Sequence, residues 1–499
     1  MNLLNQHKRL ALMLLASGTV FALSACGDGG VDSAGTAAPV SHASAMRVAG
    51  DDVPEGLEGP DGEFNIECTL SHTLPDDPVM MFGQPGKAMV HDFFGNIHAD
   101  AFTTADKLLA NPQTTCTSRA DGSAYWAPQM RRKSTGEIIK PFTMKTYYRN
   151  QDSRHPVTPF PKGLQLLAGD HHSTKSKPEI MYYCKFSANS GKYYYNPPAS
   201  CPIFDGEKAQ FNLAIEFPNC WDGKNLAPSH HGPRNAAYSV DGVCPANYPV
   251  KIPQLQMNLG YFLEGGDNNV SDLELSMNPQ MAGDVAVPVW GNLYTSHADF
   301  FNGWRADTMD YMVKYCFNRG ADCNKAIPVL NAPASDDAYV RGGTYANNNF
   351  GAEKQMLSQR GTPGVLDETK VAYMKFVLPD EDALKSAPYK DVTVHYRAVD
   401  NAPDEDFAVF FYETSADWSE QTLTQKNAPQ CGVGPAVRAW IGKSGEFKYR
   451  DSDELNKIVE EARKRSDRTV SLCMMTKIGN KEIKLGTKES GSPATLFFK

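Results

Sequence analysis

The chain has 499 residues, more than a single hydrophobic core normally organises, so we expect about two folded units. Its formal net charge of -9 at pH 7 disfavours a nucleic-acid-binding protein. None of its 11 cysteines forms a Cys-x-x-Cys pair, which leaves a structural zinc site and thioredoxin-like chemistry without support.

The start of the chain has the form of an export signal. Basic residues at positions 8 and 9 precede an apolar run, residues 10–22, that is too short to span a bilayer. The run ends in Leu-Ser-Ala-Cys at residues 23–26, which resembles a bacterial lipobox. The resemblance implies that residues 1–25 are a lipoprotein signal peptide, that a lipid on Cys26 anchors the protein, and that the cell envelope, at the outer membrane or cell surface, is its destination. An ordinary signal peptide that uncovers a free Cys26 is the alternative.

Residues 26–63 are rich in Gly, Ala, Ser, Asp and Pro and have almost no large apolar side chains, so we expect a flexible tether. Random-coil scaling gives this tether an average reach of about 33 Å. Because the chain is exported, the cysteines after Cys26 are expected to form disulfides.

Residues 64–325 are expected to form a β-rich, disulfide-tied domain with a jelly-roll or sandwich-like fold. Pro, Gly, Asn and Tyr recur so densely that short strands with long loops fit better than helices. One helix is predicted after Asp307 or Thr308, because four apolar residues fall at i, i+3, i+4 and i+7. The last of these, Cys316, is placed to pair with Cys323.

A linker at residues 326–334 contains two prolines, and residues 335–499 are predicted to be a separate β-sandwich. Residues 371–378, 392–396 and 407–412 are β-rich runs bounded by turn residues. A single helix is predicted where apolar residues repeat at helical spacing from Leu455 to Ala462. We expect Cys431 and Cys473 to pair around it.

The C-terminal unit resembles the DNRLRE-type carbohydrate-binding module. The resemblance rests on Asp-Asp-Ala-Tyr-Val-Arg-Gly-Gly-Thr-Tyr-Ala-Asn-Asn-Asn-Phe-Gly at residues 336–351, Met-Lys-Phe at 374–376 and a string beginning Asp-Trp-Ser-Glu at 417. It implies a β-sandwich that binds glycans, including acidic polysaccharides such as alginate. Charged, aromatic and amide side chains in these strings are the candidate sugar contacts: Arg341, Tyr345, Asn348 and Lys375. Alternatively, the Asn and Gly positions form a structural turn and Trp418 belongs to the core.

The N-terminal unit resembles a family of secreted fungal and bacterial domains of unknown function, the one numbered nineteen-ninety-six. Four strings carry this resemblance: residues 85–100, Asp-Gly-Ser-Ala-Tyr-Trp-Ala-Pro at 121–128, Phe-Pro-Asn-Cys-Trp-Asp-Gly-Lys-Asn at 217–225, and Thr-Ser-His-Ala-Asp-Phe-Phe-Asn-Gly-Trp at 295–304. The family has no assigned activity, so any chemistry must be argued from the residues.

Two of these strings, residues 91–96 and 297–303, echo one another. Each contains a histidine and an aspartate beside aromatic residues, where an unpaired polar group is costly to bury. In an extended segment His297 and Asp299 point to the same side, because strand side chains alternate with period two. If both segments meet at one cleft, a carboxylate can hold a histidine tautomer and produce a general base.

Three kinds of chemistry are compatible with such a cleft. A lyase would use the histidines as base, with Lys224 neutralising a uronic carboxyl and Tyr125 as acid. A glycoside hydrolase would use two of Asp92, Asp222 and Asp299. A divalent cation is the one cofactor that His and Asp ligands suggest. The full catalytic set is His91, Asp92, Tyr125, Asp222, Lys224, His231, His297 and Asp299, and the sugar-binding set is Trp126, Trp221, Asn302 and Trp304.

A structural interpretation competes with all of these, because His91 and His297 can be hydrogen-bonded core residues and Asp222 can cap a turn. The sequence favours a lipid-anchored protein that degrades a polysaccharide, uronate-containing or not, as a lyase or glycoside hydrolase. The alternatives are a non-catalytic glycan-binding or adhesion lipoprotein and a metal-binding surface protein. The expected partners are a polysaccharide and, through the lipid, a membrane, with no nucleic acid.

Overall fold

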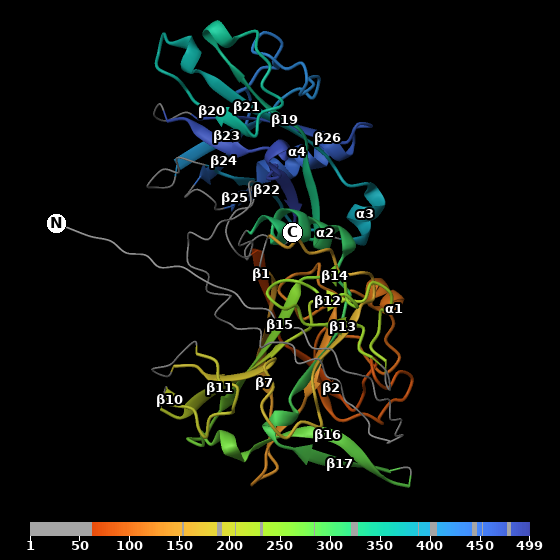
Figure 1. The fold of residues 1–499 in the computed structure, drawn as a ribbon. Helices are drawn as coiled ribbons and strands as arrows, with labels where there is room; N and C mark the ends of the chain where they lie inside the picture. Colours follow the sequence, from red (N-terminus) through yellow and green to blue (C-terminus); the bar gives the residue numbers. More distant parts are fainter. Residues whose placement is uncertain are drawn as a thin grey trace, which may run out of the picture. The chain divides into compact units, whose positions relative to one another are not determined.

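The computed structural model describes residues 62–151, 154–186, 192–204, 206–229, 233–283, 285–320, 328–387, 389–399, 407–441, 447–451, 453–476 and 481–499. The signal, Cys26, nearly all of the tether, His231 and Cys323 lie outside these residues. Strands dominate both halves of the described chain (Figure 1), as expected for a mainly β protein. In the described part, no helix combines the length and the apolar character needed to cross a membrane.

The largest sheet of the N-terminal half is antiparallel and follows the order β1, β7, β15, β11, β10, with β9 also pairing with β11. Its strands are β1 (Gly62–Cys68), β7 (Pro141–Asn150), β9 (Ile180–Cys184), β10 (Ile203–Phe204), β11 (Lys208–Glu216) and β15 (Gln254–Leu263). Alternate residues of β1, including Phe64 and Ile66, enter the core, which is the period-two pattern of a sheet with one covered face.

A second antiparallel sheet positions the candidate site. Its order is β2 (Leu70–Leu74), β3 (His91–Gly95), β4 (Ala124–Pro128), β18 (His297–Phe301) and β8 (Gln165–Gly169). Every residue of β3, β4 and β18 is buried, so both faces of this sheet are covered. Phe94, Tyr125 and Phe300 belong to the main core on one face, whereas Phe93 and Trp126 belong to a smaller cluster on the other.

Smaller elements complete this half. A four-stranded sheet contains β17 (Val285–Gly291), β16 (Leu273–Ala282), β5 (Met130–Arg132) and β6 (Ile138–Ile139). A three-stranded sheet contains β13 (Ala236–Ala237), β12 (Cys220–Trp221) and β14 (Val250–Lys251). The helices are α1 (Ala105–Ala110) and α2 (Ala306–Tyr315), and α2 is the predicted helix. Its N-cap is Arg305, without a side-chain cap bond, rather than the expected Asp307 or Thr308.

The C-terminal half is built on a curled eight-stranded antiparallel sheet with the order β24, β23, β26, β21, β19, β28, β22, β25. The strands are β19 (Leu330–Arg341), β21 (Lys370–Val377), β22 (Val392–Arg397), β23 (Phe407–Glu413), β24 (Ala436–Ile441), β25 (Phe447–Asp451), β26 (Thr469–Met475) and β28 (Thr495–Phe498). A two-stranded sheet adds β20 (Gln355–Ser358) and β27 (Ile483–Gly486), and the helices are α3 (Glu381–Ser386) and α4 (Asp453–Arg463). Because β19 starts at Leu330, the expected linker at 326–334 is wrong at its C-terminal end.

Two local predictions for this half are confirmed. Helix α4 buries Leu455, Ile458, Val459 and Ala462, the residues that repeat at helical spacing. The expectation of a single helix is wrong, because α3 is a second one. Cys431 and Cys473 form a disulfide with a Cα–Cα distance of 5.9 Å. The other described disulfides are Cys68–Cys116, Cys184–Cys201 and Cys220–Cys244, and Cys316 is also disulfide-bonded.

Candidate active site

Strand β4 brings two distant segments together. It pairs with β3 on one side, where His91 lies opposite Pro128, and with β18 on the other, where Asp299 lies opposite Trp126. Because side chains alternate along each strand, His91, His297 and Asp299 emerge on the same face. The ring centroids of His91 and His297 are 5.8 Å apart, and one nitrogen or oxygen atom of each of the three residues lies within 4.8 Å of the others.

Backbone carbonyls fix both imidazoles. Nδ1 of His91 lies 2.9 Å from the carbonyl oxygen of Asp76, and Nδ1 of His297 lies 2.9 Å from that of Thr295. Since a carbonyl oxygen only accepts, each Nδ1 carries the proton and each Nε2 keeps its lone pair. The expectation that a carboxylate holds the histidine tautomer is therefore wrong for His297, because the carbonyl oxygen of Thr295 holds it.

Burial disfavours the charged form of all three groups. It lowers the pKa of His91 to about 4, and it lowers the pKa of His297 to about 3, with the neighbouring His91 adding to the effect. Burial also raises the pKa of Asp299 well above its usual range, and the nearby Asp77 carboxylate raises it further. The cluster therefore presents two neutral imidazoles and one carboxyl group.

A cavity of ≈ 410 Å³ borders this cluster through His297, which is 4% exposed. His171, His172 and Arg234 also line it. The ring of His171 lies 5.7 Å from that of His297 and 4.0 Å from that of His172, measured between centroids. The Arg234 guanidinium donates hydrogen bonds to the carbonyl oxygens of Leu167 (3.2 Å) and Gly169 (3.4 Å), which hold it at the end of β8.

Sequence reasoning missed these cavity residues. Two of them form the adjacent histidine pair at positions 171 and 172, which is separated from the end of strand β8 by one residue. It belongs to none of the echoed strings, and a loop has no periodicity to indicate which way its side chains point.

The Cys-Trp-Asp-Gly-Lys-Asn string forms a tight turn rather than a catalytic loop. Asp222 Oδ1 accepts the backbone N–H groups of Lys224 (2.8 Å) and Asn225 (2.9 Å), and Trp221 Nε1 donates to the Asn225 carbonyl (2.7 Å). Gly223 has φ of 76°, a backbone conformation that suits glycine. Asp222, Lys224 and Trp221 are absent from the described cavity lining, so the turn-capping interpretation of Asp222 is the one that the structure favours.

Tyr125 faces away from the histidines, into the main core. Its hydroxyl donates to Asp121 Oδ2 (2.6 Å) and contacts the Tyr148 hydroxyl, to which Trp304 Nε1 also donates (2.9 Å). All four side chains are buried. The roles expected for Tyr125 as acid and Trp304 as a sugar platform are therefore wrong, because neither side chain reaches the cavity.

Three other residues of the predicted site are also buried. Asp92 points to the face opposite His91 and accepts a hydrogen bond from the Thr73 hydroxyl (2.7 Å). The Trp126 ring stacks on Phe93 with 5.4 Å between centroids and is fully buried, so no sugar can cover it. Asn302 is buried and donates to the Pro161 carbonyl (2.9 Å).

In the C-terminal half, Arg341 and Tyr345 form a half-exposed pair. The guanidinium carbon lies 3.7 Å from the Tyr345 ring centroid, and Nε donates to the Asp367 carbonyl (2.7 Å). Asn348 is exposed on the loop that follows. Lys375, by contrast, donates to the Trp418 carbonyl (2.6 Å) and pairs with Asp336 (3.5 Å), so its ammonium group is already engaged.

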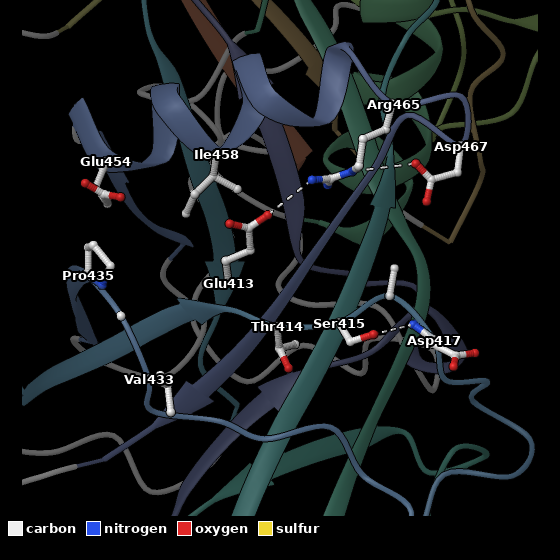
Figure 2. Close-up of a pocket in the computed structure, with 12 residues that line it drawn as sticks. Glu413, Thr414, Ser415, Asp417, Val433, Pro435, Glu454, Ile458, Arg465 and Asp467 are labelled. Carbon is white, nitrogen blue, oxygen red and sulfur yellow. Dashed lines mark hydrogen bonds and ion pairs between the residues drawn. The ribbon is translucent and has the colours of Figure 1, made fainter.

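A second cavity, of ≈ 760 Å³, lies in the C-terminal half (Figure 2). Four acidic residues line it, Glu413, Asp417, Glu454 and Asp467, together with Arg465. Arg465 lies between Glu413 (3.4 Å) and Asp467 (3.7 Å), so its charge is balanced locally. The remaining negative charge would repel a polyanion, so an acidic glycan is expected at the Arg341–Tyr345 pair rather than in this cavity.

Comparison with known families agrees with the division into two halves. Residues 77–304 match the family described as domain of unknown function DUF1996, and residues 329–499 match carbohydrate-binding module family 96. Among curated proteins, none matches the chain. The C-terminal match supports interaction with polysaccharide. The N-terminal unit thus matches the DUF1996 family model, and the C-terminal unit matches that of carbohydrate-binding module family 96.

Proposed function

We propose that this is a lipid-anchored envelope protein that cleaves a uronate-containing polysaccharide by β-elimination. The C-terminal module holds the polymer, and the N-terminal domain cuts it. The observation that carries the proposal is the ≈ 410 Å³ cavity, which brings a guanidinium group and several imidazoles to one place.

These residue types match the two demands of β-elimination. A cation must neutralise the uronate carboxylate, so that the proton on the adjacent carbon becomes acidic, and Arg234 can pair with a carboxylate bidentately. A base must then remove that proton, and a neutral histidine is suited to this near neutral pH. His171 is half-buried in the cavity wall, and burial is the main cause that lowers its pKa, so it is ready to accept a proton. The electrons of that C–H bond form a C=C bond as the C–O bond at the β position breaks. The departing oxygen takes up a proton, from the protonated His171 or from water, and an unsaturated uronate is left.

Hydrolysis has weaker support from the same geometry. It normally requires two carboxyl groups on either side of the scissile bond. The cavity wall does include Asp77 and Asp170, but both carboxylates cap backbone. Asp77 accepts the N–H groups of Val79 (3.0 Å) and Met80 (2.9 Å), and Asp170 accepts that of His172 (2.9 Å). We therefore place elimination ahead of hydrolysis.

Membrane attachment is a separate part of the proposal, supported by the Leu-Ser-Ala-Cys string at residues 23–26. Cells that express the full chain should incorporate labelled palmitate into it, and Cys26→Ser should abolish the labelling. Export without labelling of the wild-type chain would leave Cys26 as a free cysteine and remove the anchor.

The cleavage proposal is tested by incubating the purified protein with alginate, other uronate polymers and neutral polysaccharides. We expect ultraviolet absorbance from unsaturated uronate with an acidic polymer only. Arg234→Ala and His171→Ala should abolish it, while Arg119→Ala, at an exposed arginine outside the cavity wall, should not. New reducing ends without that absorbance would indicate a hydrolase. Binding without either product would leave a non-catalytic glycan-binding protein.

A further inference from the structure

The buried cluster beside the cavity contains polar atoms without a hydrogen-bond partner in the described part of the chain. Nε2 of His91 and both carboxyl oxygens of Asp299 are buried and have no hydrogen-bond partner among the residues that the structure describes. Nε2 of His297 keeps its lone pair as well, because Nδ1 donates to Thr295. Leaving several such groups unpaired in a protein interior is costly, so an additional species that accepts their lone pairs is expected.

We infer that His91, His297 and Asp299 form a binding site for a divalent transition-metal cation of the zinc type. One nitrogen or oxygen atom from each residue lies within 4.8 Å of the others, a separation that one cation can bridge. The site goes beyond the proposed cleavage, because cation binding can be measured whether or not a glycan is cut.

The surroundings of the two histidines match those of metal ligands. A ligating histidine commonly donates its other ring N–H to a carbonyl or carboxylate, which fixes the tautomer and the ring orientation. His91 does this with Asp76, and His297 does it with Thr295. Both histidines and the aspartate also stand on strands of one sheet, so their positions are set by backbone pairing rather than by loops.

The ligand types indicate which cation is preferred. Two imidazoles and one carboxylate suit zinc and its transition-metal neighbours, whereas calcium and magnesium prefer oxygen ligands. Three protein ligands leave at least one coordination position open. Of the three, only His297 lines the cavity, so the open position is expected on the cavity side. Asp77 in the cavity wall favours a cation there, and Arg234 opposes one.

Zinc binding by the full-length, untagged chain tests the inference. After chelator treatment and dialysis, isothermal titration with zinc chloride should show one high-affinity site per chain. His297→Ala and Asp299→Asn should each weaken it by more than about tenfold. The control is His98→Ala, which changes an exposed histidine outside the cluster and should leave affinity unchanged. Circular dichroism of the metal-free variants checks that each one folds.

If a variant does not fold, X-ray absorption spectroscopy at the zinc edge of the wild-type chain takes the place of the titration of that variant. We expect two imidazole nitrogens among the atoms bound to zinc. Absence of stoichiometric binding by the wild-type chain would overturn the site and leave buried water or a shared proton as the occupant. Undiminished affinity in folded His297→Ala and Asp299→Asn would overturn it too. So would a loss of binding confined to His171→Ala or His172→Ala, because that would place the cation on the cavity wall.

Discussion

Replacing Tyr148 with Phe removes one hydroxyl from the buried network that contains two of the expected site residues. That hydroxyl accepts the indole N–H of Trp304 at 2.9 Å and contacts the hydroxyl of Tyr125. The ring itself is retained, so no large cavity opens and the indole N–H simply loses its acceptor. A buried donor left without a partner costs about 1–3 kcal/mol. For a domain of this size each kcal/mol corresponds to roughly 2–4 °C in Tm.

Thermal and urea unfolding of Tyr148→Phe and wild type, followed by intrinsic fluorescence, would measure this loss. Tyr147→Phe is the matched control, because its side chain points to the other face of β7 and is only half-buried. Cleavage per folded molecule should be the same in all three proteins. If Tyr148→Phe unfolded like wild type but no longer cleaved the polymer, the reasoning would be refuted. Tyr125 and Trp304 would then be candidates for the substrate site again.

Three further predictions concern stability and glycan binding. Replacing both Cys431 and Cys473 with Ala should lower the free energy of unfolding of the C-terminal half by about 4 kcal/mol, because the disulfide closes a loop spanning 42 residues in the unfolded chain. Chemical unfolding measures this, and no measurable loss would contradict the prediction. Burial raises the pKa of Asp121 from 3.8 to about 7, so the stability that its proton provides is lost as pH rises through about 7. The free energy of unfolding of wild type, relative to that of Asp121→Asn, should therefore fall between about pH 4 and pH 7, by at most about 1.4 kcal/mol per pH unit. A difference between the two proteins that does not vary with pH would refute this prediction. Arg341→Ala should weaken binding to an acidic glycan up to about fivefold in low salt and less in high salt, and an effect that is insensitive to salt would exclude the charge argument.

Much of the architecture could be predicted because strand periodicity is local. The period-two rule placed His297 and Asp299 on one face, and helical spacing identified the buried face of α4. The convergence of His91 with them depends on β4 lying between β3 and β18, which is a non-local pairing. The echoed strings suggested this convergence but could not establish it.

Other features depend on information that the sequence does not carry. A tryptophan suits a core and a sugar platform equally well, and only the packing of Trp126 on Phe93 decides between them. The capping of the turn by Asp222, by contrast, follows from Asx-turn chemistry and is predictable from the local sequence. Arg234 is far in sequence from the strand end that holds it, so its arrival at the cavity could not be read from its neighbours.

The most direct test of the cleavage site is a crystal structure of the full-length protein in complex with a uronate oligosaccharide. We expect sugar density in the ≈ 410 Å³ cavity, with a uronate carboxylate paired with Arg234 and the adjacent carbon facing His171. Sugar bound only on the C-terminal module, with the cavity at Arg234 empty, would contradict the assignment of that cavity as the catalytic site.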